Sequence, residues 1–314
     1  MTPRFSVVIP VYNRAGLVPA TIDSVLAQTF RDFEVIVVDD GSTDETPRVL
    51  KAYGDRIRIF RQENQGPEVA RALGAAAARG DYVALLDSDD LLLPNALEIY
   101  DRIARQPPFP LLIIGLLSSF VEANGPKAAS GDPATVEVSY SRDYLSKRAM
   151  VGLSNSNVVV DRVFLAGSGG FRLSSPATFH ADEHHLILHL GECGPCAVIK
   201  RPATVAYRVH AGNSIRAVDA MIEGVRCLLQ AEHSGTYPGG RARRFERYAL
   251  IGGMAWSWIK HGWRSRLRRD AVSLLISAAP MVAAGVARKL IFAVRRRLSK
   301  SPDSVIYPPT RSIE

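Results

Sequence analysis

Three clusters of polar residues follow apolar runs within the first 90 residues. The most distinctive is Asp87-Ser88-Asp89-Asp90, because three carboxylates within four residues repel one another unless something balances their charge. A divalent cation would balance it, and carboxylate oxygens suit Mg²⁺ or Mn²⁺. Such a cation could in turn bridge a diphosphate. The alternative is a solvated turn that leads into Leu91-Leu92-Leu93-Pro94 and binds nothing.

The other two clusters offer hydrogen-bonding groups. Tyr12 and Asn13 end the first apolar run, and Asp39 and Asp40 end the second. Two adjacent carboxylates at a strand end could accept hydrogen bonds from a nucleotide base or ribose, or simply form a turn before a helix. The chain has neither the three-glycine dinucleotide fingerprint nor a Walker A loop. A cation and side chains would therefore have to hold any phosphates.

These clusters need a scaffold that brings them together. In the first 117 residues, short runs rich in Val, Ile and Leu alternate with helical stretches, which indicates a parallel sheet covered on both faces. Ligands of such sheets bind beyond the carboxyl ends of the strands, so the three clusters should converge there. The predicted strands are Phe5–Val11, Phe33–Asp39, Arg56–Arg61, Tyr82–Leu86 and Leu111–Leu117, and the predicted helices are Leu17–Gln28, Thr46–Tyr53 and Val69–Arg79.

The second half is less regular. We expect a surface loop over Glu122–Thr135 and mostly helix over residues 216–300. Between them the pattern predicts helices over Tyr140–Met150 and Ala181–Leu190, and strands over Asn157–Val160, Ala197–Ile199 and Val205–Val209.

Several motifs, in order and at the usual spacing, resemble those of family 2 glycosyltransferases. They are Ser6-Val-Val-Ile-Pro-Val-Tyr-Asn13, Val38-Asp-Asp-Gly-Ser-Thr-Asp44, Asn64-Gln-Gly66 with Ala70-Arg71, and Leu86-Asp-Ser-Asp-Asp90. The resemblance is strong over residues 4–110 and looser over residues 150–215. It implies the GT-A fold, an α/β architecture with a mostly parallel central sheet. It also implies sugar transfer from a nucleotide-diphospho-sugar with inversion of the anomeric centre, using Mg²⁺ or Mn²⁺.

The resemblance assigns roles to residues of this chain. It implies that the nucleotide-sugar is bound by Pro10, Tyr12, Asn13, Asp39, Asp40, Arg71, Asp87 and Ser88. Asp89 would be the principal metal ligand, with Asp87 and His210 as further ligands.

The catalytic base is expected in the second half, because inversion needs a carboxylate near the acceptor hydroxyl. The family carries a Glu-Asp pair after a Gly-Gly-Phe segment. Here Gly169-Gly170-Phe171 is followed by Asp182-Glu183, so the pair is reversed. Glu183 matches the position of the base, and Asp182 is the alternative. Two acids in the first turn of a helix would also suit the helix dipole without any catalytic role.

The net charge of +8 is concentrated near the C-terminus. Residues 241–300 hold 15 Lys or Arg and 2 Asp or Glu, so the rest of the chain sums to 24 − 29 = −5. Basic residues flank the uncharged run Ala271–Ala287, whereas nucleic-acid binders interleave them with aromatics, so we expect no nucleic-acid partner. An interfacial helix on anionic lipid over residues 264–300 fits this pattern, as does a helix pair packed on the domain; a membrane span fits less well.

Two cysteines, Cys193 and Cys196, have the spacing of a thioredoxin redox motif. Such a motif opens a helix after a strand, whereas this one lies between a predicted helix and a predicted strand. Three cysteines cannot pair fully, and the N-terminal run lacks the pattern of a signal peptide. We therefore expect a cytoplasmic protein, or one peripheral on the inner face of the plasma membrane.

Together these features predict a GT-A catalytic domain over residues 1–235, with a nucleotide-sugar half at 1–110 and an acceptor half at 111–235. A basic helical extension is expected over 236–300 and a disordered tail over 301–314. The predicted donor is a UDP-sugar, and the predicted acceptor is a saccharide or a lipid-linked molecule of the cell envelope. Alternatives are a non-catalytic nucleotide-sugar binder of this fold and a nucleotidyltransferase.

Overall fold

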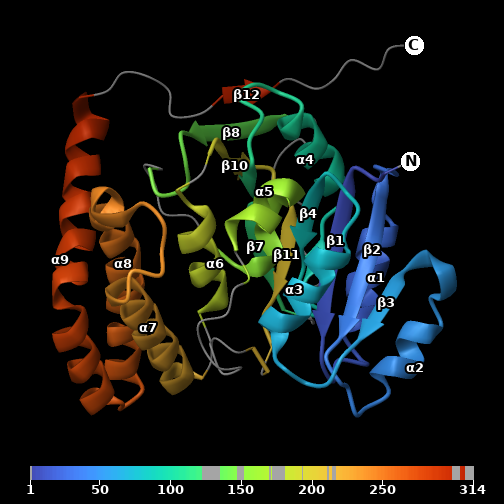
Figure 1. Ribbon diagram of the computed structural model, residues 1–314, viewed down its shortest axis with the longest axis horizontal. Coiled ribbons are helices and arrows are strands. Elements are labelled where there is room, and N and C mark those ends of the chain that lie inside the picture. Colours follow the sequence, from blue (N-terminus) through green and yellow to red (C-terminus); the bar gives the residue numbers. More distant parts are fainter. Residues whose placement is uncertain are drawn as a thin grey trace.

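The computed structural model describes residues 2–121, 135–146, 152–169, 171, 181–192, 194–210, 212–213, 217–298 and 305–307. Its centre is a nine-stranded sheet in the order β12-β8-β10-β6-β9-β4-β1-β2-β3, beside a three-stranded sheet β5-β11-β7 (Figure 1). The strands are β1 Phe5–Val11, β2 Phe33–Asp39, β3 Arg58–Arg61, β4 Tyr82–Leu85, β5 Leu91–Leu92, β6 Leu112–Ile114, β7 Leu117–Phe120, β8 Val136–Ser141, β9 Val158–Asp161, β10 Cys196–Arg201, β11 Val205–Arg208 and β12 Val305–Tyr307.

Helices cover both faces of the large sheet. They are α1 Val18–Leu26, α2 Thr46–Lys51, α3 Pro67–Ala77, α4 Ala96–Ala104, α5 Arg162–Ser168, α6 Asp182–Leu190, α7 Val218–His233, α8 Arg244–Arg264 and α9 Arg268–Leu298. One core contains side chains of α1, α2 and α4, and the other contains side chains of α3 and α5 to α9. The last three helices form a layer at one side of the molecule (Figure 1).

The sheet is mostly parallel, as expected. β1 pairs in parallel with β2 and β4, β2 with β3, and β6 with β10. β9 lies antiparallel between β4 and β6, and β8 lies antiparallel to β10. β1 and β2 have the predicted bounds because most of their residues are apolar and buried, which gives each strand a short apolar run.

The predicted strand Leu111–Leu117 is wrong in one respect, because it divides between the two sheets. β6 ends at Ile114 and β7 begins at Leu117. Gly115 lies at the break, where a Cβ atom would stand 2.3 Å from Thr204 Oγ1 and 2.7 Å from Tyr100 Oη. The chain therefore crosses between sheets at a point where only glycine fits.

The helix predicted over Tyr140–Met150 is also wrong in its described part. Tyr140 and Ser141 end β8, and residues 142–146 form bends and a turn. Val136 and Val138 are buried on one face of β8 with a period of two, which favours a strand beside β10. Residues 147–150 lie outside the described residues, as does most of the expected loop Glu122–Thr135.

Within the expected disordered tail, Val305–Tyr307 form β12 and pair antiparallel with β8. The outer edge of β8 offers unpaired backbone groups, and the short Val-Ile-Tyr run has a strand's composition. Position 235 falls in the turn that joins α7 to the later helices, and α7 packs on both α8 and α9.

Candidate active site

The three polar clusters lie at one edge of the sheet, at the carboxyl ends of β1, β2 and β4. The ends of β1 and β2 are in register, with Val11 opposite Asp39. The backbone NH of Asp40 donates to the carbonyl of Val11 at 2.9 Å, and that of Leu86 donates to the carbonyl of Val8 at 3.0 Å. The predicted convergence is therefore present in the structure.

Asn13 joins the first two clusters. It has a left-handed backbone with φ of 50°, and its Oδ1 accepts the backbone NH of Thr43 at 2.8 Å. Its own NH donates to Ser42 Oγ at 3.0 Å. Tyr12 beside it is 42% exposed, so its ring is available to a ligand, whereas Pro10 is buried in β1 opposite Val38.

The two adjacent aspartates have different environments. Asp39 is 1% exposed; its Oδ1 accepts the NH of Ser42 at 2.9 Å, and its Oδ2 lies 3.6 Å from Arg61 Nε. Asp40 accepts three hydrogen bonds, from Gln62 Nε2 at 2.7 Å and from two backbone NH groups of residues 65 and 66 at 3.0 and 2.8 Å. Asp40 thus anchors the loop that leads into α3.

The third cluster is a tight turn after β4 in which Ser88 and Asp90 are buried, whereas Asp87 is partly exposed. Asp90 is fully buried and accepts the NH of Arg208 at 2.9 Å and Ser156 Oγ at 2.6 Å. Burial, with the nearby charges of Asp87 and Asp89, raises the pKa of Asp90 to about 8. Ser88 is 8% exposed. Asp90 therefore holds the turn against β11 and the chain before β9.

Asp89 reaches His210, which is 121 positions away in the sequence. His210 Nε2 lies 2.9 Å from Asp89 Oδ2, and both side chains are partly exposed. Arg208 Nε donates to the carbonyl of Asp89 at 2.7 Å, which fixes the turn beneath this pair. Among the described residues no group of three His, Cys, Asp or Glu forms a metal site. Asp87, the third predicted ligand, instead faces Arg71.

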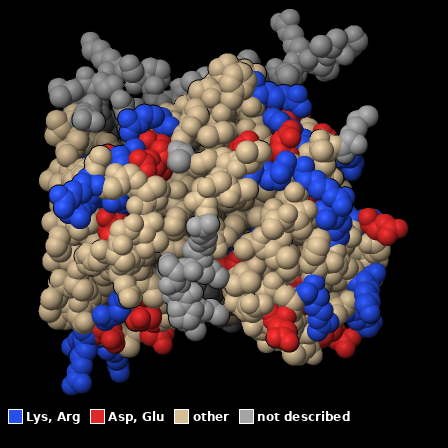
Figure 2. Space-filling view, viewed as in Figure 1, with Lys and Arg blue, Asp and Glu red and all other residues tan. Residues whose placement is uncertain are grey.

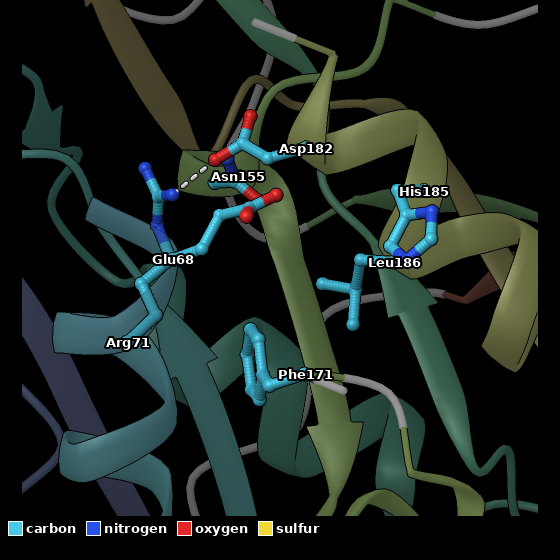
Figure 3. A pocket seen from close by; sticks show the side chains of 7 residues that line it. All are labelled: Glu68, Arg71, Asn155, Phe171, Asp182, His185 and Leu186. Carbon is cyan, nitrogen blue, oxygen red and sulfur yellow. Dashed lines mark hydrogen bonds and ion pairs between the residues drawn. The ribbon is translucent and has the colours of Figure 1, made fainter. Parts of the chain in front are cut away.

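Arg71 connects the two halves of the site. Its side chain is 6% exposed; Nη2 donates to Asp87 Oδ1 at 2.5 Å, and Nη1 forms a short ion pair with Asp182 Oδ2. The partners come from the turn after β4 and from the start of α6, so this guanidinium spans the predicted nucleotide-sugar and acceptor halves. Figure 3 shows the contact with Asp182. Burial raises the pKa of Asp87 above its ordinary value, and the charge of Arg71 only partly opposes this shift.

The two acidic residues at the start of α6 have different hydrogen-bond partners. Asp182 Oδ2 also accepts Asn155 Nδ2 at 3.0 Å, and its Oδ1 accepts the NH of Glu183 at 2.9 Å. Glu183 Oε1 lies 2.8 Å from His184 Nδ1. Burial raises the pKa of Asp182 to about 6, although Arg71 opposes the shift. Burial acts in the same direction on Glu183, but hydrogen bonds from His184 and Asp182 outweigh it and lower that pKa.

A small pocket lies beside this pair, and Glu68 is one of several lining residues that were not among the predicted site residues. Glu68, Arg71, Asn155, Phe171, Asp182, His185 and Leu186 line the pocket (Figure 3). Glu68 is 9% exposed, and burial together with the charge of Asp182 raises its pKa to about 8. Its place one helical turn before Arg71 on α3 is the signal that could have identified it.

Cys196, the described residue of the cysteine pair, does not line the small pocket. Cys196 is buried at the start of β10, and Cys227 lies on α7. The chain runs from α6 through this motif into a strand, so the motif does not open a helix. Cys193, Gly170 and Ser214 lie outside the described residues.

Comparisons with known proteins agree with this geometry. Residues 6–124 match the model of the family described as glycosyl transferase family 2. An uncharacterized glycosyltransferase of Rickettsia felis is 46% identical over 108 residues, which are 34% of this chain and 18% of that protein. Glycosyltransferase GlyG of Streptococcus pneumoniae is 32% identical over 130 residues, 40% of this chain and 42% of that protein.

The chain therefore matches less than half the length of either relative. Among solved structures, TarS of S. aureus in complex with UDP-GlcNAc superposes with a TM-score of 0.65 at 18% identity. That superposition covers 90% of this chain and 81% of the TarS chain. The fold is GT-A, and residues 6–124 are similar to glycosyl transferase family 2.

Proposed function

We propose that the protein transfers a sugar from a nucleotide-diphospho-sugar to an acceptor hydroxyl, with inversion of the anomeric centre. The observation that carries this proposal is the convergence of carboxylates from two halves of the fold. Asp39, Asp87 and Asp89 follow strands of the nucleotide-binding half, Asp182 and Glu183 begin α6, and Arg71 links the two groups. A donor held by the first group would present its anomeric carbon to the second.

A UDP-sugar is the proposed donor. Tyr12 and Asn13 lie beside Asp39, so an aromatic ring and hydrogen-bonding groups are available to a base and ribose. TarS, which shares the fold, was crystallised with UDP-GlcNAc. Asp40 would contribute indirectly, because its carboxylate is occupied by the loop over residues 62–66.

Asp89 and His210 would hold Mg²⁺ or Mn²⁺. A carboxylate oxygen and an imidazole nitrogen that lie 2.9 Å apart can converge on one cation, and both suit Mn²⁺. They supply only part of a coordination shell, which leaves positions for diphosphate oxygens and water. When bound, the cation would neutralise charge on the leaving diphosphate. Asp87 would orient Arg71 and not act as a ligand, since its carboxylate pairs with that guanidinium.

Glu183 is the proposed base. Both oxygens of Asp182 already accept hydrogen bonds, from Arg71 and Asn155 on one and from a backbone NH on the other. Asp182 therefore serves better to position the start of α6. The side chain of Glu183 extends from the same turn and stays ionised because of His184, so it can accept the proton of an acceptor hydroxyl.

The acceptor would be a saccharide or a lipid-linked molecule used in cell-envelope polysaccharide or glycolipid synthesis. The basic C-terminal region supports a location at the inner face of the plasma membrane, where such acceptors are assembled. The chain would then work as a cytoplasmic or peripheral membrane enzyme.

Donor binding and turnover can be tested separately. Thermal unfolding is measured with UDP, GDP, dTDP or CMP, with and without Mn²⁺, for wild type, Asp89→Ala and Glu183→Gln. A bound ligand raises the midpoint by mass action, and we expect UDP to do so only with Mn²⁺ and Asp89. Glu183→Gln should keep that shift yet lose about 10²- to 10⁴-fold in transfer or donor hydrolysis.

Other outcomes would favour another function. Donor binding without any turnover in wild type would indicate a non-catalytic nucleotide-sugar binder of this fold. If none of the four nucleotides raised the midpoint of thermal unfolding in the presence of Mn²⁺, the proposed site would be contradicted.

A further inference from the structure

Helix α9 has two apolar faces, and only one of them is packed. Ala271, Leu274, Ala278 and Met281 recur every three or four residues, are fully buried and belong to the core shared with α7 and α8. The helix is apolar on the opposite side too, with these exposed side chains: Val272, Leu275, Ile276, Val286, Leu290, Ile291 and Val294. A helix packed on a globular domain normally turns polar residues outward.

The same helix is long and apolar enough to cross a membrane. The most apolar 18-residue window within Arg268–Val294 has a mean hydropathy of 1.7, yet only 28% of that window is buried. A core helix of a globular protein would be mostly buried, so burial within the domain does not account for this composition. The outward face needs another environment.

Contacts on the inner face argue against a membrane-crossing orientation. A Cβ atom on Gly252 of α8 would lie 1.8 Å from the carbonyl oxygen of Met281, so the two helix backbones touch. Arg288 is 8% exposed and donates to the carbonyls of Leu145 and Glu246. A crossing helix would carry this guanidinium, and the domain attached to it, into hydrocarbon.

The apolar face continues onto α8 through two tryptophans. Trp256 is 41% exposed and Trp263 is 54% exposed. Trp263 lines a shallow groove together with Arg268, Arg269, Val272, Ser273, Ile276 and Ser277. The Arg268 guanidinium lies 5.7 Å from the centre of the Trp263 ring. Aromatic rings and arginines beside aliphatic side chains are typical of the depth at which lipid headgroups meet acyl chains.

Charge identifies the partner. Residues 241–300 carry a formal charge of 15 − 2 = +13, and the rest of the chain carries −5. In Figure 2 the side along which α9 runs is largely uncharged, with basic side chains beside a few acidic ones at its lower end and a second basic group higher up. Two copies of this face in a symmetric dimer would bring like charges together, whereas anionic lipid would neutralise them.

We infer that the outer face of α9, with Trp263 and Trp256, lies in the plane of an anionic phospholipid bilayer. Arg268 and Arg269 contact lipid phosphates, while Val272, Ile276 and the apolar residues after them enter the acyl boundary. This surface specifies how the proposed membrane location is achieved, and it does not depend on the transferase activity.

Tryptophan fluorescence can report whether this surface binds to lipid vesicles. All three of the chain's tryptophans are on α8, so intrinsic fluorescence reports from this layer alone. Wild type is mixed with vesicles of phosphatidylcholine, or of phosphatidylcholine and phosphatidylglycerol in equal parts, and vesicle-bound protein is separated by sedimentation. We expect binding and a blue shift only with phosphatidylglycerol, weakened by salt, and quenching by brominated acyl chains.

The matched variants are Ile276→Glu and Val163→Glu. These side chains are 73% and 70% exposed, and Val163 lies on α5, so neither change disturbs a core. Ile276→Glu should weaken vesicle binding by about tenfold or more, and Val163→Glu should not. Equal binding by both variants, or none by wild type, would overturn the inference.

A dimer in solution that Ile276→Glu dissociates would also overturn it, since a second copy would then cover the face. The Mn²⁺-dependent thermal shift with UDP is measured on the same variants. Absence of that shift in wild type would contradict the proposed transferase site only, whereas vesicle binding and the dimer measurement test the lipid surface.

Discussion

Arg71 is the residue through which the two halves of the site are coupled. Its guanidinium is buried between Asp87 and Asp182 and balances these two carboxylates, which are themselves partly buried. Removing one partner from a buried ion pair is costly, because the remaining charges are left unpaired. Much of the local stability should therefore depend on this one side chain.

We expect Arg71→Met to lower the free energy of unfolding by about 3 kcal/mol, since two partly buried carboxylates lose their buried counterion. The control is Arg79→Met, two residues beyond α3, where the side chain is exposed and the change should be within about 0.5 kcal/mol. Urea unfolding of both variants measures the difference. Equal losses in the two variants would show that the Arg71 ion pairs contribute nothing.

Glu68 provides a pH-dependent prediction. Its pKa is about 8 in the fold, against 4.5 for an ordinary glutamate, because it is buried beside Asp182. Between these two values the unfolded chain is ionised at this position and the folded chain stays protonated. The unfolded state then binds fewer protons, so this residue makes stability fall as pH rises from about 4.5 to about 8.

Glu68→Gln cannot ionise and should escape that loss. Relative to wild type, the variant should gain on the order of 2 kcal/mol of stability between pH 5 and pH 8. Thermal unfolding across this range tests it, with exposed Glu63→Gln as the control for removing a charge nearby. A stability difference that does not change with pH would contradict the assignment.

At the scale of elements, the contact between α8 and α9 depends on one of two adjacent glycines. A side chain on Gly252 would overlap the backbone of Met281, whereas one on Gly253 would meet nothing within 4 Å. Gly252→Ala should therefore destabilise the protein by about 1–3 kcal/mol through overpacking. Gly253→Ala should stabilise it by about 0.5–1 kcal/mol, because glycine is unfavourable within a helix. Chemical denaturation distinguishes the opposite signs.

Elements buried on both faces could be predicted well from the sequence. Phe5–Val11 and Phe33–Asp39 have the expected bounds because apolar side chains fill most of their buried positions. The strand at Val136–Ser141 was missed because its outward residues are polar and mixed. At Gly115 the change of sheet depends on Thr204 and Tyr100, whose positions no local pattern contains.

Prediction of the site from the sequence is limited in the same way. Its clusters could be predicted because they follow strands, but the contacts between them join distant positions. Asp89 and His210 are 121 residues apart, and Arg71 and Asp182 are 111 apart. In the sequence, Glu68 is an ordinary acidic residue in the first turn of a helix, a position where the helix dipole favours negative charge. Only the packing of α6 against α3 gives it a shifted pKa.

At the scale of the whole molecule, the C-terminal helices belong to the main core. A single cluster of buried side chains includes Val8 and Leu85 of the sheet, Ile187 of α6, Ile222 of α7 and Leu274 of α9. Elements that share a core unfold together, whereas separate domains can unfold independently. The helices over 236–300 should therefore not behave as an independent extension.

Tryptophan fluorescence and far-UV circular dichroism can test, in one denaturation experiment, whether the C-terminal helices unfold together with the rest of the domain. Fluorescence reports only from α8, where Trp256, Trp258 and Trp263 lie, and circular dichroism reports on every helix and strand. We expect coincident curves, and a parallel shift of both curves in Gly252→Ala, because disturbing the α8–α9 contact weakens the common core. A fluorescence transition at lower denaturant, with most ellipticity retained, would instead mean that the membrane-facing layer can detach while the nucleotide-binding half stays folded.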